Sequence, residues 1–130
     1  MEDTDQSLFS NDNALSLFDS LTSVELDALE FGVIGFDAAG VVRRYNAFES
    51  EAAGLSLPRV VGHSLFNVVA PCMNNFLVAQ RFEDAAASGT SLDATIDYVL
   101  TLRMRPVKVK LRLLSAPEVA MRYVLVQRRT

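Results

Sequence analysis

The segment Val107-Lys-Val-Lys-Leu-Arg-Leu113 decides the fold class, because its apolar and basic residues alternate strictly. Successive side chains of a β-strand point to opposite faces of a sheet, so this period of two predicts a strand with one apolar and one basic face. The same alternation runs through residues 100 to 105, and residues 123 to 127 are rich in the types that strands favour. We therefore predict three consecutive strands in the last third of the chain.

Two further strands are predicted upstream of these three. Residues 31 to 36 and 41 to 45 are rich in β-branched and aromatic side chains, and Asp37-Ala-Ala-Gly40 separates them. A short polar segment that ends in glycine between two such runs is typical of a hairpin turn. We expect the two strands to pair in antiparallel fashion.

The residues between these two groups of strands are predicted to be helical or irregular. Glycine, serine and proline divide the segment from Asn46 to Pro71 into brief helices and loops. Residues 76 to 88 place apolar side chains on one face and stop at Gly89, as a helix commonly does. The order predicts an α+β fold, with a five-stranded antiparallel sheet whose inner face is covered by the intervening helices.

The N-terminus has the pattern of a helical cap. Apolar residues between Leu8 and Leu21 recur at spacings near three and four, after the polar cluster Ser10-Asn11-Asp12, which predicts a short amphipathic helix. Thr22-Ser-Val-Glu25 reads as a capping box that begins a second helix ending near Leu29. We expect a cap over residues 1 to 30 and a core over residues 31 to 130, within one domain.

Charge is distributed unevenly along the 130 residues, of which 50% are hydrophobic and 22% charged. Residues 1 to 42 hold nine acidic side chains and no Lys or Arg, whereas residues 101 to 130 hold eight basic ones and only Glu118. We therefore expect the acidic cap to dock on the basic face of the sheet. Sparse aromatic residues in the basic segment and a net charge of −4 argue against a nucleic-acid partner.

Cys72 is the only cysteine, so no internal disulfide and no cysteine-built metal site are expected. A single thiol is either inert packing or a reactive group. No apolar run is long enough to span a bilayer, and the start lacks the features of a secretory signal. We expect a cytoplasmic protein without a membrane partner, either a monomer or a weak dimer.

Several motifs carry a resemblance to known sensor proteins. Gly54-x-Ser56-x-x-x-Val60-Val61-Gly62, followed by Phe66-x-x-Val69, resembles the stretch common to PAS sensor domains. Leu26-Asp-Ala-Leu-Glu-Phe-Gly32, Tyr45-Asn-Ala-Phe-Glu49 and Val69-Ala-Pro-Cys72 together resemble the photoactive yellow protein family, in spacing as well as identity. The resemblance runs from about Leu21 to Gln127, and it predicts a PAS-like fold.

What the resemblance implies is a blue-light photoreceptor and not an enzyme, without catalytic residues. The family carries p-coumaric acid (4-hydroxycinnamic acid) as a thioester, here on Cys72, with Tyr45 and Glu49 hydrogen-bonding its phenolic oxygen. Light would isomerise this chromophore, Glu49 would give it a proton, and the cap would rearrange. The residues expected to form the pocket wall are Ile34, Ala53, Leu55, Leu65, Val69, Ala70, Pro71, Tyr98, Leu100 and Leu102.

The residue types suit this chemistry. A cysteine thiolate is the nucleophile that can accept an activated acyl group. Because a phenol has a pKa of about 10, a phenolate at neutral pH requires hydrogen-bond donors around its oxygen. Tyr45 and Glu49 are four residues apart and would reach one point from a helix. Glu49 donates only when protonated, which burial beside an anion favours.

Two positions depart from the family pattern, which usually holds Thr and Arg where this chain has Ala53 and Leu55. Ala53 has no hydroxyl with which to support the tyrosine, and Leu55 has no guanidinium. The colour, the rate of the photocycle and the access of solvent are therefore not implied by the resemblance, whereas attachment to Cys72 is.

Two other classes of function stay open. One is a light-blind PAS domain whose Cys72 carries nothing and whose sheet binds a partner protein. The other is an enzyme with Cys72 as nucleophile and His63 as base, although no Asn or Asp stands out as an orienting partner. His63 follows Gly62 in a turn-like segment, where a surface residue is expected. The downstream signalling protein is not indicated by any motif.

Overall fold

The computed structural model describes residues 8–101 and 106–128. Its helices are α2 (Ala14–Ser20), α3 (Ser23–Asp27), α4 (Ala47–Ala53), α5 (Leu57–Val60) and α6 (Ala79–Ser88), with one turn of π-helix (Leu65–Val69) and one of 3-10 helix (Pro71–Met73). Its strands are β1 (Gly32–Phe36), β2 (Val42–Tyr45), β3 (Leu92–Leu100), β4 (Val107–Ala116) and β5 (Val119–Arg128).

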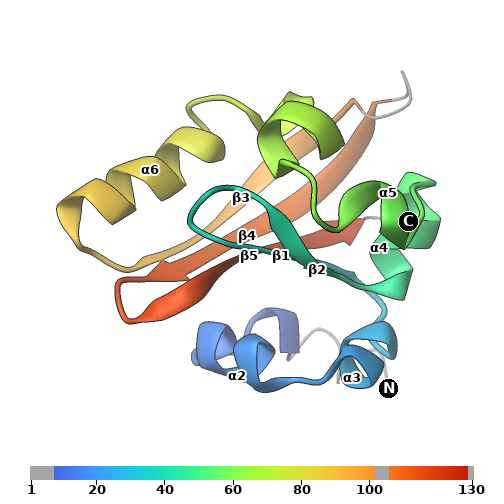
Figure 1. Ribbon diagram of the computed structural model, residues 1–130, viewed down its shortest axis with the longest axis horizontal. Helices are drawn as coiled ribbons and strands as arrows, with labels where there is room; N and C mark the ends of the chain where they lie inside the picture. Colours follow the sequence, from blue (N-terminus) through green and yellow to red (C-terminus); the bar gives the residue numbers. More distant parts are fainter. Residues whose placement is uncertain (1–7, 102–105, 129–130) are drawn as a thin grey trace.

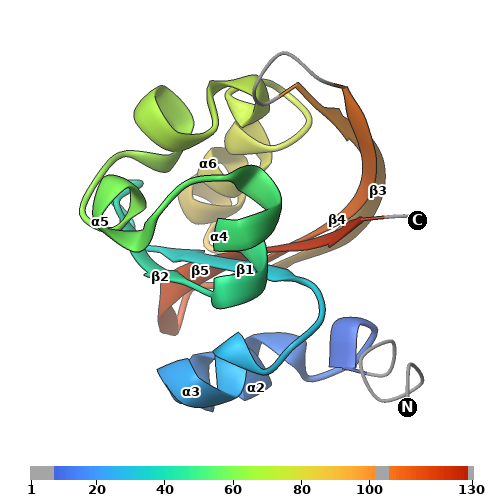
Figure 2. The same ribbon diagram turned by 90° about the vertical axis from the view of Figure 1, so that its right-hand side faces the viewer.

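The five strands form one sheet in the order β2-β1-β5-β4-β3, and all neighbouring strands are antiparallel. Helices α4, α5 and α6 lie on one face of this sheet, and α2 and α3 lie on the other (Figures 1 and 2). The predicted α+β fold with a five-stranded antiparallel sheet is confirmed. The sheet therefore has two buried faces, and each has its own core.

The inner core lies between the sheet and α4 to α6. Strand residues Ile34, Phe36, Leu111 and Val124 are almost fully buried there, and they pack against Phe82 of α6. The ring centroids of Phe36 and Phe82 are 5.0 Å apart in an edge-to-face arrangement, which adds to the gain from burial. This core also receives the side chains of the candidate site.

The outer core lies under the cap. Phe9 and Phe18 pack edge-on against Phe31, with ring centroids 5.5 and 5.9 Å apart. Leu114 and Leu125 of the sheet complete the cluster. The cap docks on the outer face of the sheet, as predicted, and it covers Arg112, but the surface that it covers is not mainly basic. The covered face is mainly apolar because a docked helix buries its apolar stripe against it.

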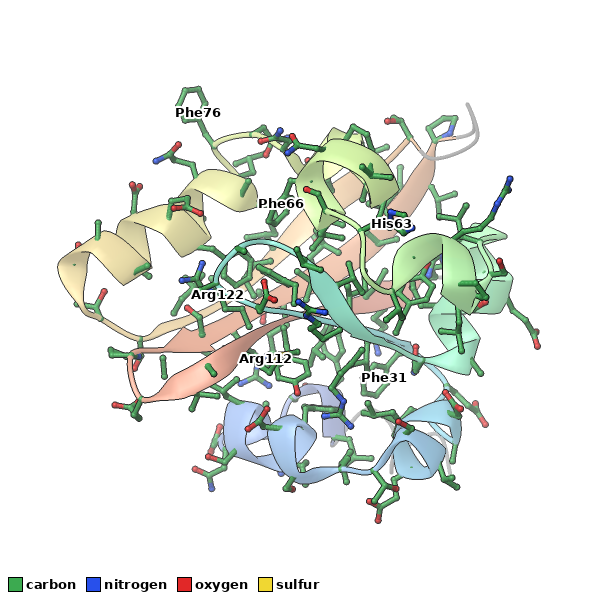
Figure 3. All side chains as sticks on the ribbon, viewed as in Figure 1. Phe31, His63, Phe66, Phe76, Arg112 and Arg122 are labelled. Atoms are coloured by element: carbon green, nitrogen blue, oxygen red, sulfur yellow. The ribbon has the colours of Figure 1, made fainter. Side chains whose placement is uncertain are left out.

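Two arginines nevertheless attach the cap to the sheet. Arg44 of β2 donates hydrogen bonds to the carbonyls of Phe18 and Leu21, where α2 ends, and to the Tyr123 hydroxyl. Arg112 of β4 donates to the Phe9 carbonyl over 2.7 Å and lies between the sheet and the cap (Figure 3). Thus the basic side chains bind backbone carbonyls of the cap.

Asp19 of the cap also takes part in this contact. It accepts a hydrogen bond of 3.0 Å from the Tyr123 hydroxyl. Burial raises the pKa of Tyr123 to about 12, so this hydroxyl stays a donor.

Three predicted elements differ from the observed ones. The helix expected over 8 to 21 is interrupted, because a turn at 10 to 13 precedes α2. A strand was expected over 100 to 105, but the third strand of the structure, β3, lies earlier and ends at Leu100. Residues 102 to 105 lie outside the described part. The segment Leu92-Asp-Ala-Thr-Ile-Asp-Tyr98 alternates in the same way, so the sequence held a signal for β3 that our interpretation missed.

The third difference is the start of α6. Phe76 and Leu77 were expected on the buried face of a helix from 76 to 88, but they are 83% and 55% exposed, and Phe76 points away from the body (Figure 3). The Asn75 side chain accepts hydrogen bonds from the backbone N–H groups of Leu77 and Val78. This local turn competes with the first helical turn, so the helix begins at Ala79.

Candidate functional site

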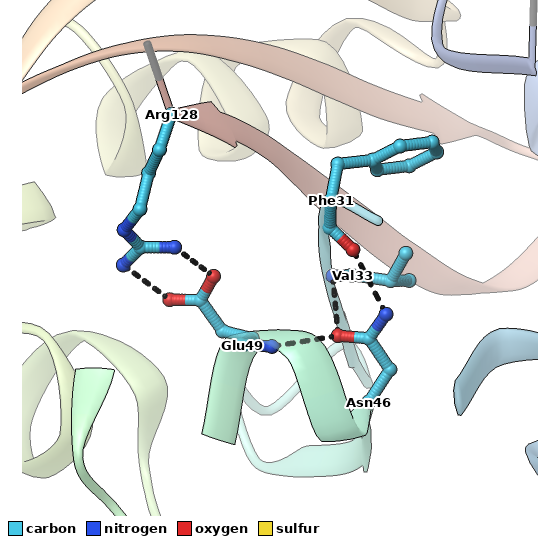
Figure 4. Close-up of polar contacts among 5 residues, drawn as sticks. All are labelled: Phe31, Val33, Asn46, Glu49 and Arg128. Atoms are coloured by element: carbon cyan, nitrogen blue, oxygen red, sulfur yellow. Dashed lines mark hydrogen bonds and ion pairs between the residues drawn. The ribbon is translucent and has the colours of Figure 1, made fainter. Parts of the chain in front are cut away.

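Asn46 determines how Glu49 is presented. It is the N-cap of α4, and its Oδ1 accepts hydrogen bonds from the backbone N–H groups of Glu49 and Val33 (Figure 4). Its Nδ2 donates to the carbonyls of Phe31 and, in α3 of the cap, Leu26, each over 2.9 Å. One buried amide therefore joins the helix of Glu49, strand β1 and the cap.

Glu49 lies on the buried side of the first turn of α4. Its carboxyl accepts two hydrogen bonds from the Arg128 guanidinium of β5, at 2.6 and 3.0 Å (Figure 4). Space for this carboxyl exists because residue 32 is glycine: a methyl group at Gly32 would collide with Glu49 Oε1. The Glu49 side chain is 2% exposed and that of Arg128 16% exposed.

Burial and Arg128 act on Glu49 in opposite directions. Burial raises the pKa of the Glu49 carboxyl above its ordinary value, and it outweighs the hydrogen bond and the positive charge of Arg128, which lower it. A carboxyl held between these two influences can change its protonation state when its surroundings change.

Tyr45 ends β2 close to Glu49. Burial, and after it the negative charge of Glu49, raise the pKa of Tyr45, so its hydroxyl keeps its proton. Within residues 8–101 and 106–128, the Tyr45 hydroxyl makes no hydrogen bond, although the residue is only 6% exposed. A nearly buried phenol without an acceptor is a donor that a ligand oxygen could use.

Cys72 is half-buried in the 3-10 turn and packs against the inner core. Its carbonyl accepts hydrogen bonds from the Tyr98 hydroxyl of β3 at 2.5 Å and from Asn75 Nδ2 at 3.2 Å. Asn75 also donates to the Tyr98 hydroxyl at 2.6 Å. The backbone that carries the thiol is thus fixed from two sides.

Most of the expected wall residues gather in the same core. Tyr45 and five of them are buried within the cluster that Cys72 contacts, and Leu55 and Tyr98 pack against it. The five are Ile34, Leu65, Val69, Ala70 and Leu100. Ala53 is buried in α4, whereas Pro71 is exposed. Leu102 lies outside the described residues.

Features that would support other kinds of site are weaker. His63 is an exposed loop residue, and its backbone carbonyl accepts a hydrogen bond from the N–H of Val42. Figure 3 shows it above the sheet on the side of α5. No group of three His, Cys, Asp or Glu side chains that could hold a metal ion occurs in the described part of the chain. Nor is any described helix long and apolar enough to cross a membrane.

Comparison with known proteins identifies the family. The photoactive yellow protein of Rhodothalassium salexigens is 33% identical over 108 residues, which cover 83% of this chain and 86% of that protein. The chain belongs to the photoactive yellow protein family. The photoactive yellow protein of Rhodobacter capsulatus is 28% identical over 102 residues, covering 78% of this chain and 82% of that protein. No protein-family model matches the chain.

Solved structures agree with this family. The photoactive yellow protein domain of the sensor histidine kinase Ppr from Rhodospirillum centenum superposes with a TM-score of 0.79 and 37% identity, covering 87% of this chain and 98% of that domain. The PAS domain of the RpfR quorum-sensing receptor from Cronobacter turicensis, at 16% identity and a TM-score of 0.60, shares the fold; the match covers 78% of this chain and 95% of that one. The chain is thus a sensory PAS domain of the photoactive yellow protein type.

Three residues of the site were missed by sequence reasoning. Asn46 had a local signal, since Asn is a preferred N-cap before a helix, but its contacts to the cap depend on the tertiary fold. Gly32 was read as part of a strand and as the end of a family motif, but not as the residue that makes room for the Glu49 carboxyl. Arg128 was counted as one of eight basic residues near the C-terminus, and nothing local singled it out.

Proposed function

We propose that this chain is a blue-light photoreceptor that carries p-coumaric acid as a thioester on Cys72. The observation that supports this best is that three groups lie in or beside one core: the half-buried thiol of Cys72, the Tyr45 phenol, which has no hydrogen-bond partner among the described residues, and the buried carboxyl of Glu49 near Tyr45. Membership of the photoactive yellow protein family supports the same assignment.

Attachment is an acyl transfer to Cys72. The thiolate Sγ attacks the carbonyl carbon of an activated p-coumaroyl donor, a sulfur–carbon bond forms, and the bond to the donor's leaving group breaks. The leaving group departs with the electron pair of that bond, and the thiol proton passes to solvent. Tyr98 and Asn75 hold the Cys72 carbonyl, so the position of the backbone is fixed while Sγ reacts.

Tyr45 and a protonated Glu49 would bind the phenolic oxygen and favour its anionic form. The p-coumaroyl group, when bound, would supply absorption of visible light and isomerisation of its double bond. Glu49 then gives up its proton and becomes a carboxylate in a buried place. Because a buried charge costs several kcal/mol unless it is paired, the surroundings of Glu49 must adjust.

Asn46 offers a route from this adjustment to the cap. It accepts from the N–H of Glu49 and donates to the carbonyl of Leu26 in α3. A shift of the first turn of α4 would therefore weaken a contact of the cap, residues 1 to 30, with the core from residue 31 onward. We propose that a rearranged cap is the signal to a partner protein, and that the chain is a cytoplasmic photoreceptor, without catalytic turnover.

Reconstitution tests this function. The purified protein, incubated with an activated p-coumaric acid such as its anhydride, should gain a visible absorption band that survives gel filtration. Cys72→Ala should stay folded by circular dichroism and gain no band, and His63→Ala should behave like the wild type. A folded wild-type protein that gains no band would instead favour a light-blind PAS domain. A requirement for His63 would favour cysteine-nucleophile chemistry.

A further inference from the structure

The pair between Glu49 and Arg128 conflicts with the proton donor that the proposed function requires. Both nitrogens of the guanidinium fork donate to the two carboxyl oxygens, at 2.6 and 3.0 Å. Two parallel bonds of this length are the arrangement of an ionised carboxylate with an arginine. A carboxylate has no proton to donate, whereas a Glu49 that binds a phenolate must carry one.

The conflict is resolved if Glu49 has a different charge in the empty and the filled protein. We propose that Arg128 is a positioning residue that keeps one negative charge in the site: the Glu49 carboxylate when the site is empty, and the phenolate, beside a neutral Glu49, when it is filled. This inference rests on the proposed function. The same pair would form again after Glu49 has given its proton to the phenolate.

The surroundings of Glu49 contain few other charges that could take this role. Tyr45 faces it from β2 and is neutral, because burial raises its pKa. Strand β1 brings the uncharged Gly32 against the carboxyl. Asp27 of α3 accepts from the N–H of Ala47 at the exposed start of α4, and Glu51 of α4 is exposed. Among the described residues, Arg128 is thus the cation in direct contact with the Glu49 carboxyl.

The burial of Glu49 and the partial burial of Arg128 make the charge of the pair sensitive to whether the site is filled. When the negative charge passes from the Glu49 carboxylate to the phenolate, both beside Arg128, the total charge of the site is unchanged. No further ion must therefore be buried. Removal of Arg128 leaves the carboxylate without this partner. Glu49 should then take up a proton even in the empty protein, because burial is the largest influence on its pKa and raises it.

The first test uses the empty protein and needs no pigment. Infrared spectra at pH 8 should show no protonated-carboxyl band from Glu49 in the wild type. Arg128→Gln should gain such a band, which must vanish in the double variant with Glu49→Gln. Arg128→Lys keeps the positive charge and should lack the band. The matched control is Arg122→Gln, an arginine of β5 outside this pair, which should resemble the wild type.

The second test uses the reconstituted protein. Titration of the visible band follows the phenol, and Arg128→Gln should raise its midpoint by about one pH unit or more, a tenfold change in the ratio of phenolate to phenol. Arg122→Gln should leave the midpoint unchanged. A protonated Glu49 in the empty wild type would overturn the proposal. So would infrared spectra of Arg128→Gln and Arg122→Gln that do not differ. If no pigment attaches to the wild type, the proposed function fails, and the role of Arg128 towards a phenolate fails with it.

Discussion

The glycine at position 32 permits a strong test of how the site is built. A methyl group there would collide with Glu49 Oε1 and would lie 2.9 Å from its Cδ and 3.2 Å from its Cβ. Gly32→Ala must therefore displace the Glu49 carboxyl from Arg128 or separate β1 from α4. Gly35, on the same strand, is the matched control, because a methyl group there meets side-chain atoms at 3.0 to 3.1 Å.

The expected cost follows from two effects. Overpacking of a core usually costs about 1–3 kcal/mol, and breaking a buried ion pair by removing one partner costs about 3–5 kcal/mol. Glu49 can take up a proton when it loses Arg128, which limits the second cost. We expect Gly32→Ala to lower the free energy of unfolding by about 3 kcal/mol and Gly35→Ala by about 1 kcal/mol.

Urea unfolding of four proteins measures how much of this cost passes through Glu49. They are the wild type, Gly32→Ala, Glu49→Ala and the double variant. Since Glu49→Ala removes the colliding carboxyl, Gly32→Ala should cost about 2 kcal/mol less in that background. An equal cost of Gly32→Ala in both backgrounds would refute the reasoning, because the collision would then not involve the carboxyl.

Three further predictions concern protons, colour and the cap. Because burial gives Glu49 a folded-state pKa above its ordinary 4.5, the folded protein binds the extra proton, so stability should fall as pH rises from about 4.5. Urea unfolding from pH 4.5 to 8 should show that Glu49→Gln lacks this contribution. In the reconstituted protein, Glu49→Gln should shift the absorption maximum to longer wavelength, since a weaker donor leaves more charge delocalised along the chromophore; an unshifted maximum would contradict the contact. Deletion of residues 1 to 24 should keep the colour and prolong the light state, and residues 8 to 30 should exchange amide hydrogens faster in light; equal exchange in both states would exclude the cap as the signal.

The sequence predicted those elements whose signals are local. The capping box of Thr22 and Glu25 is present as expected, with both reciprocal hydrogen bonds. Gly40 and Gly89 have φ values of 82° and 67°, in the left-handed region that glycine adopts readily, and they close the predicted hairpin and helix. The strands predicted over residues 107 to 113 and 123 to 127 were also found, although β4 extends to Ala116 and β5 begins at Val119.

Features that depend on contacts distant in sequence could not be predicted in the same way. Arg128 reaches Glu49 because β5 pairs with β1, which places two residues 79 positions apart side by side. Arg112 was expected on the face that the cap covers, but its partners there, Asp93 and the Phe9 carbonyl, could not be predicted. In each case the partner is set by sheet register and cap docking.

Mass spectrometry of the reconstituted protein tests the central claim most directly. After incubation with activated p-coumaric acid, intact mass should show one added p-coumaroyl group per chain, and peptide mapping should place it on the peptide that contains Cys72. Cys72→Ala should keep its unmodified mass under the same conditions. An unmodified wild type, or an adduct on Cys72→Ala of equal yield, would contradict the account.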